Sequence, residues 1–298
     1  MVVGVRARAG LLLPSGMSKL CRVGGSSIGA GRSLAIIGGP CVLESPELGL
    51  AVGTAVRDAC VKHALPYIFK ASYDKANRSS IHSARGPGLE KGLEQIAEIR
   101  ARLGVPATTD IHEAGHAEPA ARVVDLLQIP AFLCRQTDLL LAAGKAAAKH
   151  GRAVNVKKGQ FMSPAEMANA VSKLREAGCD NIMLTDRGTF FGYGRLVNDF
   201  VGIGDMLEQG APDAVPVCFD CTHSTQHPGQ AEGGTVTGGR RERSPLLARA
   251  AVAAGVHALF LEAHPNPPKA MSDSATQLYL ESVPELLRQV AAIRAALT

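Results

Sequence analysis

Polar or reactive side chains recur where short apolar segments end along this chain of 298 residues. Packing alone would allow alanine or glycine at several of these ends, so the pattern favours a functional site. In a barrel of alternating strands and helices, the active site lies where strands end and loops begin. The residues at the eight ends are Cys41, Lys70, Asp110, Gln128, Lys157, Asp186 with Arg187, Asp220 with His223, and Glu262.

Cations from separate segments are expected to converge at these ends. They are Lys70, Lys75, Arg78, Lys157 and Arg187. Clustered cations repel one another, so the arrangement predicts anionic ligands such as a phosphate and a carboxylate. The alternative is that some of them form structural ion pairs with Asp110, Asp186 or Asp220.

A dispersed metal site is a second hypothesis. Cys41, His223 and Glu262 follow the first, seventh and eighth apolar segments, which are neighbours in a closed barrel, and Asp273 follows soon after. A thiolate, an imidazole and two carboxylates suit a borderline divalent ion such as zinc, iron or manganese. From spacing alone, a buried small Cys41 is the simpler reading.

Two short motifs point to other chemistry but fit it poorly. The segment 112–116 matches the zinc-protease pattern H-E-x-x-H, yet it directly follows an expected strand and Gly115 interrupts it. Cys218 and Cys221 match C-x-x-C, but residues three apart on a strand point to opposite faces. Neither a peptidase nor a redox or zinc-ribbon site is therefore favoured.

Alternating strand and helix patterns are expected to position these residues. Expected strands are 34–38, 67–70, 107–110, 124–128, 153–157, 181–185, 215–220 and 258–262, and expected helices include 46–63, 88–103, 137–150, 164–177, 245–254 and 276–297. Eight strand–helix units predict a (β/α)8 TIM barrel spanning residues 33–298 as a single domain. A doubly wound sheet is the alternative, although no G-x-G-x-x-G follows the first strand. The Gly- and Thr-rich stretch 229–239 is expected to be a loop or lid.

Composition narrows the class of protein. Hydrophobic residues make up 46% of the chain, enough for a full core, and the net charge of +5 is not clustered into runs. That mild excess suits small anionic substrates better than nucleic acid. Seven scattered cysteines suggest reduced thiols in a cytoplasmic enzyme, and no apolar run approaches the ~18 residues of a membrane span.

The first 32 residues are basic and contain no acidic residue. We expect a poorly ordered extension, or a start assigned too early with Met17 as the true beginning. A transit peptide is the less favoured alternative. The apolar run at 11–13 is too short for a secretory signal.

Motifs throughout the chain resemble those of the 3-deoxy-D-manno-octulosonate 8-phosphate synthases. The resemblance extends from residue 34 to the C-terminus. It lies in FKASYDKANRSS (69–80), GPGL (86–89), TDIHE (109–113), QIPAF (128–132), RQTD (135–138), NVKK (155–158), DRG (186–188), FGY (191–193), GGRR (238–241) and EAHP (262–265).

The resemblance implies a barrel, often a homotetramer, that condenses phosphoenolpyruvate with D-arabinose 5-phosphate and water. It implies that phosphoenolpyruvate is held by Lys70, Lys75, Gln128, Lys157 and Arg187. The sugar phosphate would contact Asn77, Arg78 and Ser79, with Arg135 reaching it from a neighbouring subunit. Ser72, Asp110, Phe132 and His223 are further expected substrate contacts, and Lys75, Asn77, His223 and Asp273 are the expected catalytic residues.

The family has metal-dependent and metal-independent branches, and the latter carry Asn where this chain has Cys41. The segment 272–278 also resembles the metal branch. This implies a divalent zinc, iron, manganese or cobalt ion held by Cys41, His223, Glu262 and Asp273. The chain departs from the shared pattern in its basic extension and at Gly194 and Arg195.

Two other functions are alternatives to this one. The related seven-carbon synthase, phospho-2-dehydro-3-deoxyheptonate synthase, uses erythrose 4-phosphate and typically has a Lys-Pro-Arg-Thr loop where residues 75–78 read KANR. A sugar-phosphate-binding barrel without catalysis would bind both ligands and release no phosphate.

Overall fold

The computed structural model describes residues 19–76, 84–210, 213–229 and 238–297. Eight parallel strands form a closed barrel, because the first and last strands of the row β11-β8-β7-β6-β5-β4-β3-β14 also pair with each other. The strands are β3 (Ala35–Gly39), β4 (Tyr67–Lys70), β5 (Ala107–Asp110), β6 (Leu126–Ile129), β7 (Ala153–Lys157), β8 (Ile182–Asp186), β11 (Val217–Asp220) and β14 (Ala258–His264). The predicted TIM barrel is confirmed, and the doubly wound alternative is excluded.

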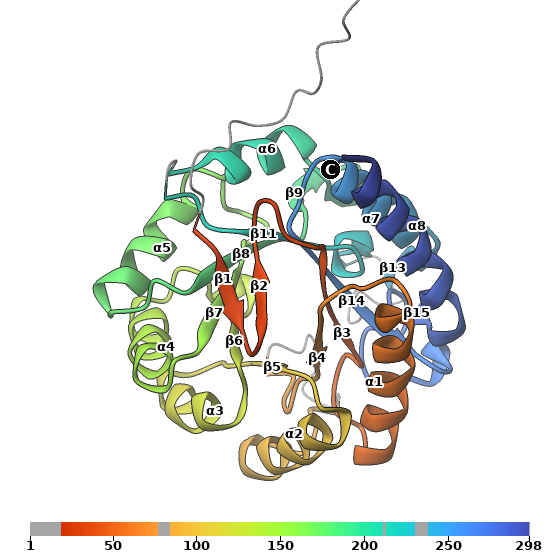
Figure 1. The fold of residues 1–298 in the computed structure, drawn as a ribbon, viewed down its shortest axis with the longest axis horizontal. Coiled ribbons are helices and arrows are strands. Elements are labelled where there is room, and N and C mark those ends of the chain that lie inside the picture. The colour runs from red at the N-terminus through yellow and green to blue at the C-terminus, as the bar shows by residue number, and fades with distance from the viewer. Residues whose placement is uncertain (1–18, 77–83, 211–212, 230–237, 298) are drawn as a thin grey trace, which may run out of the picture.

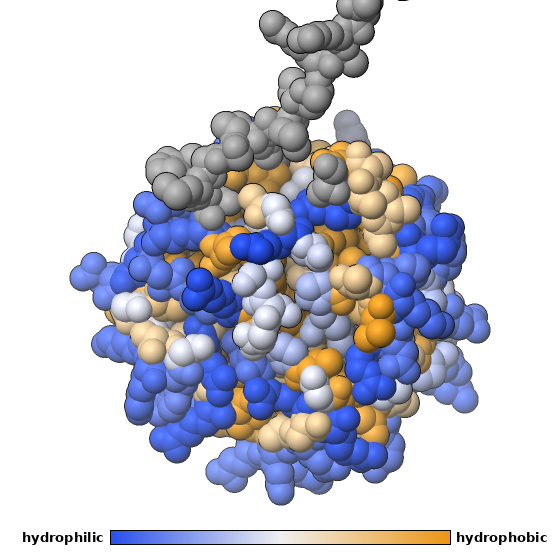
Figure 2. Space-filling model, viewed as in Figure 1, coloured by the Kyte–Doolittle hydropathy of each residue, from blue (hydrophilic) through white to orange (hydrophobic). Residues whose placement is uncertain are grey.

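Helices surround the barrel in Figure 1. They are α1 (Pro46–Val61), α2 (Leu89–Leu103), α3 (Ala117–Val123), α4 (Thr137–His150), α5 (Met167–Glu176), α6 (Phe200–Glu208), α7 (Ser244–Ala253) and α8 (Val283–Leu297). Hydrophilic side chains predominate around the circumference in the same view (Figure 2). Among the described residues, no helix is long and apolar enough to cross a membrane.

Alternation along each strand divides the core into two parts. In β3, Ile36 packs outward with the helix-facing cluster, whereas Ile37 belongs to a second cluster inside the barrel. Successive side chains of a strand point to opposite faces, so each strand supplies both clusters. The interior cluster also contains Phe260 of β14 and Cys218 of β11.

An N-terminal hairpin lies within the segment that was expected to be poorly ordered. Strands β1 (Cys21–Val23) and β2 (Ser26–Ile28) pair antiparallel, and Figure 1 shows them across one end of the barrel. Cys21, Val23 and Ile28 are fully buried in the interior cluster. Their burial explains why the expected poorly ordered segment does not extend to residue 32; residues 1–18 lie outside the described residues.

The end of the chain differs from expectation as well. A last helix is predicted from Thr276, but α8 begins at Val283, with Pro284 in its first turn where proline is tolerated. Before it, β15 (Leu278–Tyr279) pairs with β14. The expected start is wrong because these residues extend the sheet.

Two further hairpins lie beyond the barrel strands. Strands β9 (Thr189–Gly192) and β10 (Arg195–Val197) follow β8, and β12 (Gln226–His227) pairs with β13 (Gly238–Gly239). The pairing of β12 with β13 flanks the expected lid, whose residues 230–237 lie outside the described residues.

Candidate active site and metal centre

A cavity of about 510 Å³ lies at the carboxyl ends of the barrel strands. Parallel strands bring their carboxyl ends to one face of a barrel, which is why residues distant in sequence meet here. The lining includes Lys70, Lys75, Asp110, Phe132, Lys157, Arg187, His223, Glu262 and Asp273. All nine are among the residues expected to contact substrate or metal.

Two of the cations in this cavity form ion pairs with residues that the structure describes, and two do not. Lys157 donates to Asp220 over 2.8 Å, and Lys70 forms an ion pair with Glu262, so part of the structural-ion-pair alternative holds. Lys75 and Arg187 form no ion pair with any residue that the structure describes. They remain available to an anionic ligand.

Arg187 is held by neutral oxygens. Its guanidinium donates to the side-chain oxygen of Gln226 and, over 3.5 Å, to the carbonyl of His223. Burial lowers the pKa of Arg187, although nearby acids, led by Asp220, oppose the shift. A guanidinium that is buried and has no carboxylate partner among the described residues is suited to bind a phosphate or carboxylate.

Asp110 is the centre of a buried polar network. It accepts from the Ser72 hydroxyl and, over 2.7 Å, from the Gln128 side-chain amide. Burial acts to raise the pKa of Asp110, but the charges of Lys70 and Lys75 outweigh it and hold the pKa far below its usual range. Asp110 is therefore an ionised acceptor that orients the side chains around it.

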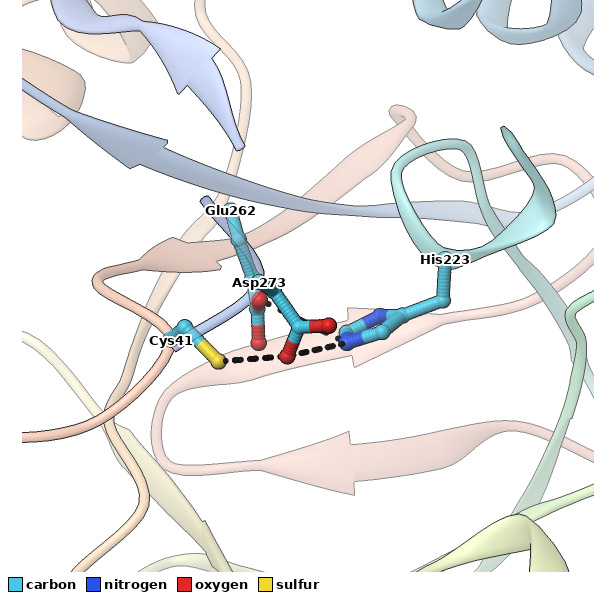
Figure 3. Close-up of side chains that lie close together, drawn as sticks. All are labelled: Cys41, His223, Glu262 and Asp273. Atoms are coloured by element: carbon cyan, nitrogen blue, oxygen red, sulfur yellow. Dashed lines mark hydrogen bonds and ion pairs between the residues drawn. The ribbon is translucent and has the colours of Figure 1, made fainter. Parts of the chain in front are cut away.

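The metal quartet, Cys41, His223, Glu262 and Asp273, converges as expected (Figure 3). One potential ligand atom from each residue lies within 4.8 Å of the other three. The Cys41 Sγ is 2.9 Å from Asp273 Oδ2, and His223 Nε2 is 3.4 Å from Glu262 Oε2. The four potential ligand atoms are therefore close enough together to bind a single metal ion.

The tautomer of His223 is set by Asp220. His223 Nδ1 lies 2.7 Å from Asp220 Oδ2, which leaves Nε2 directed towards the quartet. Burial acts to raise the pKa of Asp220, but His223 and Lys157 hold it well below its usual range. A carboxylate on the far nitrogen of a ligating histidine is the usual arrangement around a bound metal.

Two observations show that the quartet fits a divalent cation. Glu262 Oε2 is buried and has no hydrogen-bond donor among the described residues. Burial, followed by the charges of Asp273 and Glu262, raises the pKa of the Cys41 thiol, and a cation would reverse that shift.

Some expected site residues lie elsewhere. Gln128 is fully buried beside the cavity and also accepts from Asn155 over 3.0 Å. Arg135 is exposed and does not line the cavity of its own chain. Asn77, Arg78 and Ser79 lie outside the described residues.

Sequence reasoning missed Gln226 and His112. Gln226 donates to Asp273 Oδ1 over 2.9 Å while accepting from Arg187, so it joins the quartet to the anion cavity. His112 also lines the cavity, and burial lowers its pKa. Their positions, three residues after His223 and two after Asp110, were the available signal.

The two misleading motifs are accounted for. Only residues 114–116 of the H-E-x-x-H segment are helical, as one 3-10 turn, and the rings of His112 and His116 pack edge-on against Tyr73. Cys218 lies in the interior cluster and Cys221 in the outer cluster. The opposite faces predicted for the two thiols are confirmed.

Comparisons with known proteins identify the family of the chain. The model of the DAHP synthetase I family matches residues 15–297. The chain is 52% identical to a 2-dehydro-3-deoxyphosphooctonate aldolase of Cyanothece sp. over 91% of this chain and 96% of the relative. Proteins of the same description from Desulfotalea psychrophila and Granulibacter bethesdensis are 51% and 46% identical, over 90% and 93% of this chain and 92% and 94% of theirs.

Proposed function

Because the chain belongs to the DAHP synthetase I family, and within it to the 2-dehydro-3-deoxyphosphooctonate aldolases, we propose a mechanism for that reaction built on its barrel-mouth cavity. The enzyme is 3-deoxy-8-phosphooctulonate synthase. It condenses phosphoenolpyruvate with D-arabinose 5-phosphate and water to 3-deoxy-D-manno-octulosonate 8-phosphate and phosphate. The observation that carries the proposal is the cavity that joins converging cations to the metal quartet.

Phosphoenolpyruvate occupies the cationic part of the cavity. Lys75 and Arg187, which have no ion pair among the described residues, bind its phosphate and carboxylate together with Lys70 and Lys157. Gln128 acts through Asp110, to which it donates. Charge-assisted contacts contribute about 1.5–3 kcal/mol each, so several of them fix the orientation of this small anion.

The sugar phosphate extends from the aldehyde towards the loop that follows β4. Asn77, Arg78 and Ser79 of that loop bind the pentose phosphate, while Ser72, Asp110 and Phe132 shape the space between the two substrates. Arg135 is exposed on its own chain, which supports a role across a subunit boundary in a homotetramer.

Condensation begins when C3 of phosphoenolpyruvate attacks the aldehyde carbon. The new C–C bond leaves positive character at C2, and the aldehyde oxygen takes a proton. Water adds to C2 and loses a proton, which gives a hemiketal phosphate. The bond between C2 and the phosphate oxygen then breaks, and the products are the ketone and phosphate. Fixing both substrates in one cavity lowers the entropic part of the barrier.

Four side chains are assigned to the chemical step. Lys75 and Asn77 stabilise the developing oxyanion, and His223 and Asp273 handle protons near the aldehyde and the water. When bound to Cys41, His223, Glu262 and Asp273, a zinc, iron, manganese or cobalt ion would supply positive charge that orients water or the aldehyde. All seven cysteines are free thiols, which supports a cytoplasmic enzyme acting in lipopolysaccharide sugar synthesis.

Phosphate release from phosphoenolpyruvate tests the proposal. We expect release with arabinose 5-phosphate, loss of release after complete metal removal, and recovery when a divalent ion is returned. Phosphate release from phosphoenolpyruvate with erythrose 4-phosphate but not with arabinose 5-phosphate would support the seven-carbon synthase. Binding of both ligands without release would support the non-catalytic barrel, and full activity of the metal-free protein would refute the metal assignment.

A further inference from the structure

Phe260 lies beneath the active-site cavity, where its ring faces two of the lysines. The residue is in β14, two positions before Glu262, and is fully buried in the interior of the barrel. The Nζ of Lys157 is 3.5 Å from the centroid of the ring, and the Nζ of Lys70 is 5.5 Å away. The imidazole of His223 also packs against the ring, with centroids 5.8 Å apart.

The two lysines beside the ring are buried charges that need stabilisation. Lys157 and Lys70 are only 6% and 1% exposed, so both ammonium groups have lost most of their hydration. Each already has one carboxylate partner, Asp220 or Glu262. A further carboxylate would stabilise the charges but would also compete with an anionic substrate.

An aromatic face attracts a cation without neutralising it. The negative face of the ring interacts with an ammonium group within about 6 Å of its centroid, and both lysines satisfy that distance. Lys157 has one side-chain acceptor among the described residues, Asp220, so its remaining N–H groups are available to a ligand.

We propose that Phe260 is a positioning residue, which holds Lys157 and Lys70 as charged donors to phosphoenolpyruvate through the face of its ring. The proposal rests on the proposed function, since it concerns how that cavity binds the enol phosphate. Phe260 acts through the lysines and contacts no reacting atom.

Substitutions at two phenylalanines provide a matched test. Phe260→Leu removes the ring, and pentafluorophenylalanine at position 260 keeps its shape while reversing the electrostatic character of its face. Phe219→Leu is the control, because Phe219 is equally buried but lies in the outer cluster, stacked on Phe200 with centroids 6.0 Å apart. It removes the same apolar group without touching the lysines.

The readouts are the dissociation constant of phosphoenolpyruvate by titration calorimetry and the KM of arabinose 5-phosphate. We expect both changes at position 260 to weaken phosphoenolpyruvate binding about three- to thirty-fold, equivalent to about 0.7–2 kcal/mol. The KM of the pentose phosphate should change less than about twofold, and Phe219→Leu should leave both constants near those of the unmodified enzyme.

Two results would overturn the proposal. Wild-type affinity with the fluorinated ring would show that only packing matters, and equal weakening by Phe219→Leu would show a general loss of stability. If Phe260→Leu does not fold, the shape-conserving fluorinated variant still decides. Failure of the proposed function is distinct, because the unmodified enzyme would then release no phosphate from the two substrates.

Discussion

Replacing Lys157 with methionine should separate the stability of the active site from its affinity for substrate. Lys157 is 6% exposed and donates over 2.8 Å to Asp220, which is fully buried. After Lys157→Met, Asp220 Oδ2 keeps only His223 as a side-chain partner among the described residues. Removing one member of a buried pair typically costs about 3–5 kcal/mol.

We expect the lower end of that range, about 3 kcal/mol, because Asp220 Oδ1 still accepts from the backbone N–H groups of Thr222 and His223. Loss of the contact to phosphoenolpyruvate should also weaken its binding about 10- to 150-fold, from about 1.5–3 kcal/mol for a charge-assisted bond. Guanidinium unfolding at one fixed protein concentration and titration calorimetry measure the two effects.

The double variant Lys157→Met with Asp220→Asn is the control for this prediction. It removes both charges, so stability should recover by most of the loss while phosphoenolpyruvate binding stays weak. A single variant within about 1 kcal/mol of wild-type stability would contradict the buried-pair argument. Recovery of binding in the double variant would refute the assignment of Lys157 as a ligand-binding cation.

Three further predictions concern the metal, the pH dependence and the barrel backbone. Cys41→Asn should weaken metal binding by at least about 100-fold while preserving some turnover in excess divalent ion, and elemental analysis against Cys179→Ser, at a buried thiol outside the quartet, checks the loss of metal. Burial lowers the pKa of His257 to about 4. The unfolded state therefore takes up its proton first as the pH falls below about 6.5, and stability declines by about 3 kcal/mol down to pH 4. His257→Asn, which can still accept from Val217 N–H, should flatten that part of the pH–stability curve, and an unchanged slope would contradict the reasoning. Gly39→Ala should cost about 3 kcal/mol, because its Cβ would overlap the carbonyl oxygen of Lys70, whereas Gly115→Ala has open space and should lie within about 0.5 kcal/mol of wild type.

The barrel could be predicted because eight short apolar runs alternate with stretches of helical spacing. Composition does not show how the first and last strands pair. Once eight strands were expected, however, the first, seventh and eighth had to be neighbours, and this placed Cys41, His223 and Glu262 together. The predicted quartet is confirmed as a spatial cluster.

Other features depend on contacts that sequence spacing does not encode. The N-terminal hairpin is ordered because Cys21, Val23 and Ile28 fill the barrel interior, and a short basic segment carries no periodic signal for that. Gln226 was missed because its role comes from Arg187 and Asp273, which are 39 and 47 residues away. Tertiary contacts of this kind override local pattern.

The lysine pairs show a further limit of sequence reasoning. Converging cations predicted anionic ligands, and the same residues also suited structural ion pairs. In the structure, Lys70 and Lys157 have carboxylate partners, whereas Lys75 and Arg187 have none among the described residues. The distances between these cations and the nearby carboxylates are needed to tell the paired cations from the unpaired ones.

A competition between two aldehydes tests the central claim most directly. The metal-loaded enzyme receives limiting phosphoenolpyruvate with equal concentrations of arabinose 5-phosphate and erythrose 4-phosphate, and mass spectrometry identifies the product. We predict that the eight-carbon 3-deoxy-D-manno-octulosonate 8-phosphate accounts for nearly all of the phosphate released. A predominantly seven-carbon product, or phosphate released without a new sugar acid, would contradict this account.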